Sequence, residues 1–365
     1  MKVALLGNAK SIHIVKFANK LSEKGHDITI ISLSMHENEN GNLDKRVKTF
    51  IISGKNTLAY YLASNNLKQY LMKEKFDVIN AHYASGYGTL ARLAKASPLV
   101  LNVWGSDVYD FPYKNFYTNK LIKRNLKYAK ILVSTSHAMK KQVERLIEPT
   151  EPIRVVPFGV DVSHFKYVKR ERKNMVTIGI IKTLAPKYGI SYLIRAFKEL
   201  LDIEKGKIET RLLIYGEGVQ EDELYELAES LGILQNVEFK GYIDNKLVPN
   251  ALSEFDIFVG SSTLDSESFG VALVEAMATG LPIVATDVSG FKEVVDDNKT
   301  GIIIPKENPS EMCEALKIMI ENYNTRIQMG LAGYEKVHKL YDINKNTDEL
   351  INTYSICIAK DHKHV

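Results

Sequence analysis

The stretch VALLGNAKSIHIVKFANKLSEKGHDITIIS, residues 3–32, contains the pattern that decides the fold. Val3–Leu6 is a short apolar run that ends in a loop at Gly7, and the apolar residues that follow recur with helical spacing. Gly25 stands where a helix would end, and Ile28–Ser32 is a second, β-branched strand. Strand, helix and strand in this order are typical of a parallel sheet with helical crossovers.

The same alternation of apolar runs and helical patterns continues along the chain. Further buried strands are predicted at Phe76–Asn80, Leu99–Val103 and Ile131–Ser134. A second series is predicted at Val176–Ile181, Arg211–Tyr215, Val237–Phe239, Ile257–Gly260, Ile283–Thr286 and Gly301–Ile304, with helices at Tyr192–Leu201 and Glu221–Leu231. A charged stretch, 166–174, separates the two series. The 365 residues are therefore expected to form two doubly wound α/β domains, 1–163 and 164–340, the first completed by a C-terminal helix within 341–365.

Composition excludes several classes of protein. The content of hydrophobic residues, 45%, and of charged residues, 25%, is ordinary for a globular protein. Cys313 and Cys357 are the only cysteines, which argues against a disulfide framework or a structural zinc site and fits a reducing cytosol. The first apolar run is too short for a signal peptide, and no stretch approaches the roughly 20 apolar residues of a membrane span. We expect a cytoplasmic protein, at most at the cytoplasmic face of the membrane.

Charge is distributed unevenly between the two halves. Residues 1–160 contain 24 Lys and Arg against 12 Asp and Glu, whereas residues 161–365 contain 24 against 32. One interpretation is chance combined with solvated helix faces. The other is that the N-terminal half meets an anionic partner, such as a membrane surface or a phosphorylated acceptor. The charge pattern leaves both open.

The segment ESFGVALVEAMATGLP, residues 267–282, carries the strongest chemical signal. Val271–Thr279 is predicted to be a helix, and its first N–H groups, next to Gly270, suit phosphate or sugar oxygens. Glu275, about one turn along, can accept hydrogen bonds from a diol such as ribose, and Glu267 on the preceding loop can reach other hydroxyls. The alternative is an ordinary loop-to-helix junction with two surface glutamates.

A second signal, KTLAPKYG at residues 182–189, follows a predicted strand. Lys182 and Lys187 in such a loop can hold a diphosphate and neutralise the charge of a leaving group. Lysines in loops are more often simply solvated, so the position of this pair beyond a strand's carboxyl end is what gives it weight.

These motifs make the chain similar to a known family. It resembles the retaining glycosyltransferases of family 4, whose two Rossmann-like domains form the architecture called GT-B. The family's two spaced glutamates are matched by Glu267 and Glu275, and its diphosphate-binding pair by Lys182 and Lys187, although the first of these is more often Arg. Further matches are Gly216-Glu-Gly218, Pro157-Phe-Gly-Val-Asp161 and the Lys-Gly-His-Asp-Ile run at residues 24–28, so the resemblance spans most of the chain.

The resemblance implies roles for particular residues. The catalytic group would be Glu267, Lys182 and Lys187, and Glu267 would also contact the donor sugar. The donor-binding residues would be Gly7, Gly216, Phe269, Gly270, Val271 and Glu275. Glu275 would hold the ribose, the amides of 269–271 the sugar, and Gly7 would let the backbone approach the phosphates.

The chain departs from the family pattern at two places. Where the family often has His-Gly-x-Asp, this chain has Trp104-Gly-Ser-Asp107, so its single Trp replaces the His that commonly contacts the donor sugar. Trp104 and Asp107 are therefore candidates for the sugar or acceptor pocket, and a His-assisted role is in doubt. The double Gly of the first loop is replaced by Gly7-Asn8. No Asp-x-Asp motif occurs, so the resemblance implies a reaction that needs no metal or other cofactor.

The acceptor side is expected in the N-terminal domain, by the same resemblance. His82 follows a predicted strand and precedes glycines, so it is a candidate for the acceptor pocket, with a structural His as the alternative. The segment 111–130 combines aromatic and basic residues, which suits an anionic membrane and lipid head groups, unless it is an ordinary helix with a solvated basic face. None of the familiar nucleic-acid-binding modules is present.

The sequence thus predicts an enzyme that moves a sugar from a nucleotide diphosphate sugar, UDP-linked, to a lipid-linked or oligosaccharide acceptor in surface polysaccharide or glycolipid synthesis, with retention at the anomeric carbon. Two alternatives remain. One is a nucleotide-sugar epimerase of GT-B architecture, and the other is a non-catalytic subunit that binds a sugar nucleotide.

Overall fold

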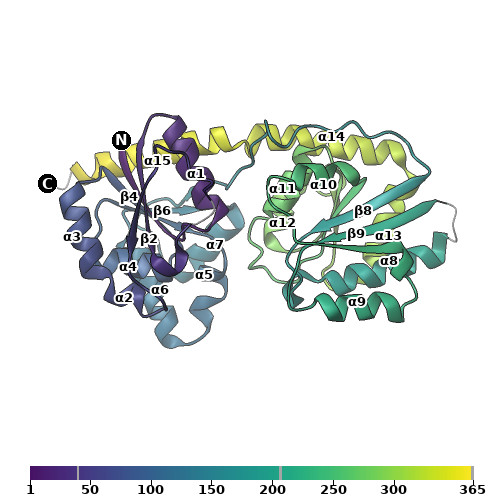
Figure 1. Cartoon of the computed structure of the whole chain (residues 1–365), viewed down its shortest axis with the longest axis horizontal. Helices are drawn as coiled ribbons and strands as arrows, with labels where there is room; N and C mark the ends of the chain where they lie inside the picture. Colours follow the sequence, from purple (N-terminus) through teal and green to yellow (C-terminus); the bar gives the residue numbers. More distant parts are fainter. Residues whose placement is uncertain (39–40, 205–207, 363–365) are drawn as a thin grey trace. The chain divides into compact units, whose positions relative to one another are not determined.

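A computed structural model describes residues 1–38, 41–204 and 208–362 (Figure 1). The chain divides into two compact units. The N-terminal unit comprises Met1–Phe158 together with the chain from Ile343 onward, and the C-terminal unit comprises Gly159–Asp342. The expected architecture of two doubly wound α/β domains is confirmed.

The N-terminal unit is built on a sheet in which every neighbouring pair of strands is parallel. Its strands are β1 (Lys2–Leu6), β2 (Asp27–Leu33), β3 (Lys48–Ile52), β4 (Val78–His82), β5 (Leu99–Val103), β6 (Ile131–Ser134) and β7 (Arg154–Val155), in the order β3-β2-β1-β4-β5-β6-β7. Its helices are α1 (Ile12–Glu23), α2 (Ala59–Leu62), α3 (Ser64–Glu74), α4 (Gly86–Leu93), α5 (Ser106–Tyr109), α6 (Phe116–Tyr128), α7 (His137–Leu146) and α15 (Ile343–His362), with 3-10 turns η1 (Ser34–His36) and η2 (Phe111–Tyr113). Helix α15 packs against α1, β4 and β5, so the end of the chain completes this unit.

The C-terminal unit repeats the plan with a second parallel sheet. Its strands are β8 (Met175–Ile181), β9 (Glu209–Tyr215), β10 (Val237–Gly241), β11 (Ile257–Gly260), β12 (Ile283–Thr286) and β13 (Gly301–Ile304), in the order β10-β9-β8-β11-β12-β13. Its helices are α8 (Ile190–Glu204), α9 (Glu221–Ser230), α10 (Val248–Glu254), α11 (Val271–Ala278), α12 (Ser289–Val294), α13 (Pro309–Glu321) and α14 (Tyr323–Leu340), with 3-10 turns η3 (Pro186–Tyr188) and η4 (Leu234–Asn236).

Continuous apolar strands explain why both sheets are covered on two faces. All four residues of Val3–Leu6 are fully buried, which requires helices above and below the strand. In the C-terminal unit, α8 and α13 pack together and share one core with the sheet, while α11 packs against α14 (Figure 1). Each unit therefore has its own hydrophobic core.

The strand order places one topological switch point in each sheet. In the N-terminal unit, β1 lies beside β4, and in the C-terminal unit, β8 lies beside β11. Open α/β sheets bind ligands beyond the carboxyl ends of the strands at such points. The loops after β1 and β4, and those after β8 and β11, are thus the places to examine for sites.

The structure differs from the sequence expectations in a few elements. Strands β3 and β7 were not predicted, because both are short edge strands whose residues are partly exposed. Strand β4 begins two residues later than predicted, so His82 is its last residue and not part of the loop after it. The charged stretch 166–174 lies within the C-terminal unit, and its Arg170 is buried, with its guanidinium donating to the carbonyls of Phe255 and Thr279.

Candidate functional site

A charged cluster lies beyond β8 in the C-terminal unit. Lys182 is the first residue after that strand, and its Nζ donates to the Glu267 carboxylate at 2.8 Å. The same Nζ lies 4.5 Å from the centre of the Tyr188 ring, and Lys187 Nζ lies 4.8 Å from it. Two cations thus flank one aromatic ring, with a carboxylate beside them. The three residues predicted to be catalytic are close together in the structure.

The two loops of the switch point are tied to each other by backbone contacts. Gly189 has φ +61°, and a Cβ there would lie 2.2 Å from the carbonyl oxygen of Ser261. Ser261 Oγ donates to the Tyr188 carbonyl at 2.7 Å, and Thr263 N donates to the Lys187 carbonyl at 2.9 Å. The loop after β8 is therefore held against the loop after β11, which positions the lysines.

Helix α11 begins beside this cluster. Its N-cap is Gly270, with φ +81°, where a Cβ would lie 2.8 Å from the ring of Phe291. The side chain of Phe269 is buried and packs edge-on against Tyr341, so only its backbone is available to a ligand. Val271 is the first helical residue, and Glu275 lies buried further along the same helix.

Two further glycines around the cluster, Gly216 and Gly290, are required by close packing. At Gly216, φ is +136° and a Cβ would lie 1.9 Å from the carbonyl oxygen of Lys182. At Gly290, which the sequence did not single out, a Cβ would lie 2.4 Å from the carbonyl oxygen of Glu267. One small hollow of about 10 Å³, roughly the space that one water molecule needs, is lined by Lys182, Tyr188 and Gly270 together with neighbouring residues. These three residues are therefore close to one another.

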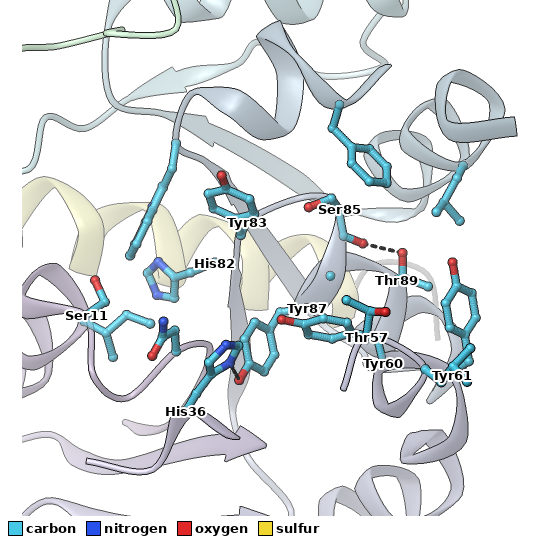
Figure 2. Close-up of a pocket in the computed structure, with 17 residues that line it drawn as sticks. Ser11, His36, Thr57, Tyr60, Tyr61, His82, Tyr83, Ser85, Tyr87 and Thr89 are labelled. Carbon is cyan, nitrogen blue, oxygen red and sulfur yellow. Dashed lines mark hydrogen bonds between the residues drawn. The ribbon is translucent and has the colours of Figure 1, made fainter. Parts of the chain in front are cut away.

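A much larger pocket, about 660 Å³, lies in the N-terminal unit at its switch point (Figure 2). Its wall consists of Asn8, Ser11, Ile14, His36, Thr57, Leu58, Tyr60, Tyr61, His82, Tyr83, Ser85, Gly86, Tyr87, Thr89, Trp104, Phe111 and Leu121. Figure 2 shows aromatic rings and hydroxyl groups around the space, with His82 at one side and Tyr61 at the other. The volume is within the range of ligand pockets, roughly 300–1,000 Å³.

His82, a predicted pocket residue, is in the wall of this pocket and is held by a chain of hydrogen bonds. Tyr354 of α15 donates to Asn80 Oδ1 at 2.6 Å, and Asn80 Nδ2 donates to the Val100 carbonyl and to Asn102 Oδ1, both at 3.2 Å. Asn102 Nδ2 therefore faces His82 Nδ1, 3.3 Å away. Because the amide can only donate, Nδ1 accepts and the proton is on Nε2. Burial lowers the pKa of His82 to about 3.

Trp104 also lines the pocket, whereas Asp107 does not. Asp107 is fully buried, and its carboxylate accepts hydrogen bonds from the amides of Ala84, Trp104 and Gly105 at 2.7, 3.1 and 2.9 Å. The expectation that Asp107 faces the pocket is corrected, because its oxygens are directed at the backbone that carries Trp104. Its carboxylate therefore ties together the backbone of Ala84, Trp104 and Gly105.

Gly7 packs beneath α1. A Cβ at this position would lie 2.2 Å from Ile14 Cδ1, so the glycine has a packing reason in addition to any role toward phosphate. Among the described residues, no three His, Cys, Asp or Glu side chains lie close enough to hold a metal ion, and independence of metal stays a prediction. Within the same residues, every helix is too short or too polar to cross a bilayer.

Two family models match the chain. Residues 161–336 match the family described as "Glycosyl transferases group 1", and residues 2–136 match "Glycosyl transferase 4-like". Between them they cover nearly all of the first unit's sheet and nearly all of the second unit. The segments that carry the charged cluster and the aromatic pocket both lie within these matches.

Individual proteins are similar over most of the chain. The phosphatidyl-myo-inositol mannosyltransferase of Mycolicibacterium smegmatis is 26% identical over 373 residues, which cover 94% of this chain and 88% of that protein. The N-acetyl-alpha-D-glucosaminyl L-malate synthase of Bacillus anthracis is 23% identical over 318 residues, 82% of this chain and 79% of that protein. The crystal structure of Anabaena Alr3699/HepE in complex with UDP has a TM-score of 0.80 at 16% identity, covering 97% of this chain and 100% of that one, a likeness of fold.

Proposed function

Since this chain belongs to the family 4 glycosyltransferases of GT-B fold, we propose that it transfers a sugar from a UDP-linked donor to a lipid-linked or oligosaccharide acceptor, with retention at the anomeric carbon. The product would belong to surface polysaccharide or glycolipid assembly. The chain is a transferase enzyme, and the epimerase and the non-catalytic subunit are not favoured, because both family models describe transferases.

The observation that carries the proposal is the charged cluster, in which Lys182 and Lys187 flank Tyr188 and Lys182 donates to Glu267. A diphosphate leaving group gains negative charge as the bond to the sugar breaks, and two fixed cations stabilise that charge. In this proposal the lysines bind the diphosphate, Glu267 binds hydroxyls of the sugar, and Glu275 binds the ribose.

Similar proteins support this assignment. The Anabaena structure is a complex with UDP, and the mycobacterial relative is named for transfer of mannose to phosphatidyl-myo-inositol. A nucleotide diphosphate donor and an acceptor linked to lipid are both consistent with these names.

A donor screen tests the proposal. Thermal unfolding of the purified protein is measured with UDP-, GDP- and ADP-sugars, because a ligand that binds the folded state raises the midpoint by mass action. We expect the largest rise with a UDP-sugar, and NMR of the product should show the donor's anomeric configuration. A rise only with GDP- or ADP-sugars, or an inverted product, would contradict the corresponding part of the proposal.

Glu275→Ala should raise the donor KM, whereas Glu267→Ala should lower kcat.

We also propose that the N-terminal unit associates with anionic membrane at the cytoplasmic face. Helix α6 begins with two exposed rings, Phe116 and Tyr117, which are 72% and 81% exposed, and carries exposed Lys120, Lys123 and Lys127. Exposed rings and cations together suit the interface of an anionic bilayer.

Vesicle sedimentation tests this association. Binding to vesicles with 30% phosphatidylglycerol should fall on raising the salt concentration, and should be lost in the double variant Phe116→Ser/Tyr117→Ser. Tyr242→Ser, at a position of the C-terminal unit that is 70% exposed, is the matched control and should bind as the wild type does. Equal binding by the double variant would show that α6 is not the contact.

A further inference from the structure

We infer that the N-terminal pocket takes an uncharged, hydroxyl-bearing ring of the acceptor, and that any phosphate or carboxylate of the acceptor stays outside it. This inference rests on the proposed transfer reaction, since it concerns which part of the acceptor the enzyme holds. It goes further because it specifies the chemistry of the group that enters the pocket.

The wall of the pocket carries no charge at neutral pH. None of the seventeen described residues that form it is Lys, Arg, Asp or Glu. The two ionisable side chains that could become cationic are His36 and His82, and burial lowers the pKa of both. The absence is informative because residues 1–160 contain twice as many basic as acidic side chains.

No residue of the wall could pair with an anion in this pocket, and Lys10, whose charge adds to the effect of burial in lowering the pKa of His36, is not part of the wall. Taking an ionised phosphate or carboxylate out of water without a cation or a set of N–H donors is strongly unfavourable. A polyol ring has no such cost, because its hydroxyls can exchange water for the hydroxyls of Ser11, Thr57 and Ser85. Its C–H faces can pack on the rings of Tyr60 and Trp104.

His82 cannot supply the missing cation. Asn102 directs an N–H at Nδ1, so protonation of that atom would set two donors against each other. Its Nε2 carries the proton, is buried, and has no hydrogen-bond partner in the described structure. An oxygen of a polyol would satisfy this donor once neighbouring side chains of the wall move aside, because Nε2 has almost no exposed surface. An unpaired buried donor is itself destabilising, so a ligand oxygen that pairs with it gains a favourable interaction.

The backbone around the pocket is shaped for it. Tyr83, the residue after β4, has φ +82°, a conformation that is unfavourable for a bulky side chain and concentrates at functional sites. At Gly86, the first residue of α4, a Cβ would lie 2.5 Å from Cζ of Tyr60. The ring of Tyr60 therefore occupies the space that the Cβ of any other residue at position 86 would need. The absence of a side chain at Gly86 thus allows Tyr60 to form this part of the wall.

The single tryptophan gives a direct test, because Trp104 is part of the pocket wall and its fluorescence responds to changes around it. The protein without donor is titrated with methyl α-D-glucoside and methyl α-D-mannoside, and with glucose 1-phosphate and mannose 1-phosphate. The same titrations compare myo-inositol with myo-inositol 1-phosphate. We expect a saturable change with at least one neutral ring, and a midpoint at least about tenfold higher for its phosphate.

A matched pair of variants tests the location. Tyr61 in the pocket wall and Tyr225 on α9 of the C-terminal unit are both 47% exposed. Tyr61→Ala should weaken binding of the neutral ring by about tenfold, a loss typical of a truncated aromatic contact, and Tyr225→Ala should not change it. Binding of UDP, measured by calorimetry, should be the same in both variants.

Each outcome has a defined meaning. Equal or tighter binding of the phosphates would overturn the inference, and so would the absence of any change with neutral rings in a protein that still binds UDP. Failure to bind any nucleotide, with the neutral-ring titration intact, would instead contradict the proposed donor reaction. The two hypotheses therefore fail separately.

Discussion

The charged cluster of the C-terminal unit and the aromatic pocket of the N-terminal unit occupy equivalent places in two similar sheets, yet differ in electrostatics. Beyond β8, two lysines flank one tyrosine ring, and a glutamate accepts a hydrogen bond from one of them. Beyond β1 and β4, seventeen residues form a wall with no formal charge. The fold thus supplies the position of a site, and the side chains in the loops decide its chemistry.

The charge of each site is opposite to what the net charge of its half of the chain would suggest. The acidic half contains the cation pair, and the basic half contains the uncharged pocket. Net charge acts over long range on encounter and on surfaces, whereas a site is governed by the groups within a few ångströms. The basic surface of the N-terminal unit is therefore better explained by an anionic surface outside the pocket than by an anion within it.

Removing a lysine from the cluster should have the largest effect. For Lys187→Ala we expect kcat to fall about 10²- to 10³-fold, the usual loss when a fixed group that stabilises developing charge is removed. Steady-state kinetics with the donor found by the thermal screen measures it. Lys182→Ala should behave similarly.

Lys240 provides a closely matched control for Lys182. It is ion-paired with Glu238 at 2.7 Å, lies over the Tyr215 ring at 6.0 Å, and its side chain is 29% exposed, against 23% for Lys182. Lys240→Ala should retain wild-type turnover. If both alanine variants lost activity equally, the loss would reflect general destabilisation and not chemistry at the cluster.

The extent of prediction from sequence also differs between these two regions. The strands were accessible because each depends on a local apolar run. The members of the charged cluster were accessible because two local motifs and the family resemblance mark them, although Lys182 and Glu267 lie 85 residues apart. The pocket as a whole was not accessible, although its residues His82 and Trp104 were candidates, because its wall combines loops and helices from Asn8 to Leu121. The chain of amides that fixes His82 was still less accessible, since it ends at Tyr354, 274 residues from its partner Asn80. Only folding brings these groups together.

Acidification should destabilise the pocket through His82. Its folded pKa, about 3, lies below the unfolded value near 6.5, so the unfolded chain binds the proton first and stability falls as pH drops from 6.5 toward 3. Between pH 6.5 and 5 this amounts to about 1.6 kcal/mol. Urea unfolding followed by Trp104 fluorescence should show it, and His82→Asn should reduce the pH dependence by that amount. An unchanged dependence would mean that His82 titrates normally.

Two glycines allow each site to be disturbed without the other. Gly270→Ala forces an alanine into φ +81° and against Phe291, which should cost about 1–2 kcal/mol and weaken UDP binding. Gly86→Ala displaces the ring of Tyr60 and should weaken binding of neutral rings by a similar amount. Calorimetry with UDP and the Trp104 titration should show opposite selectivity in the two variants. Loss of both ligands in either one would show that the change unfolds more than its own site.

The smallest effect concerns the ion pair within the cluster. In the structure Lys182 donates to Glu267, and in our proposal it must turn to the diphosphate when the donor binds. Glu267→Gln removes the charge that competes for Lys182, so UDP should bind more tightly by about 0.5–1 kcal/mol, the typical contribution of a partly exposed ion pair. UDP is the suitable ligand for this test because it has no sugar and therefore makes no contact with Glu267 that the variant could lose. Turnover of the UDP-sugar should fall in the same variant. Glu238→Gln, beside Lys240, should change neither quantity. Weaker UDP binding by Glu267→Gln would indicate that Glu267 holds Lys182 in place and does not compete for it.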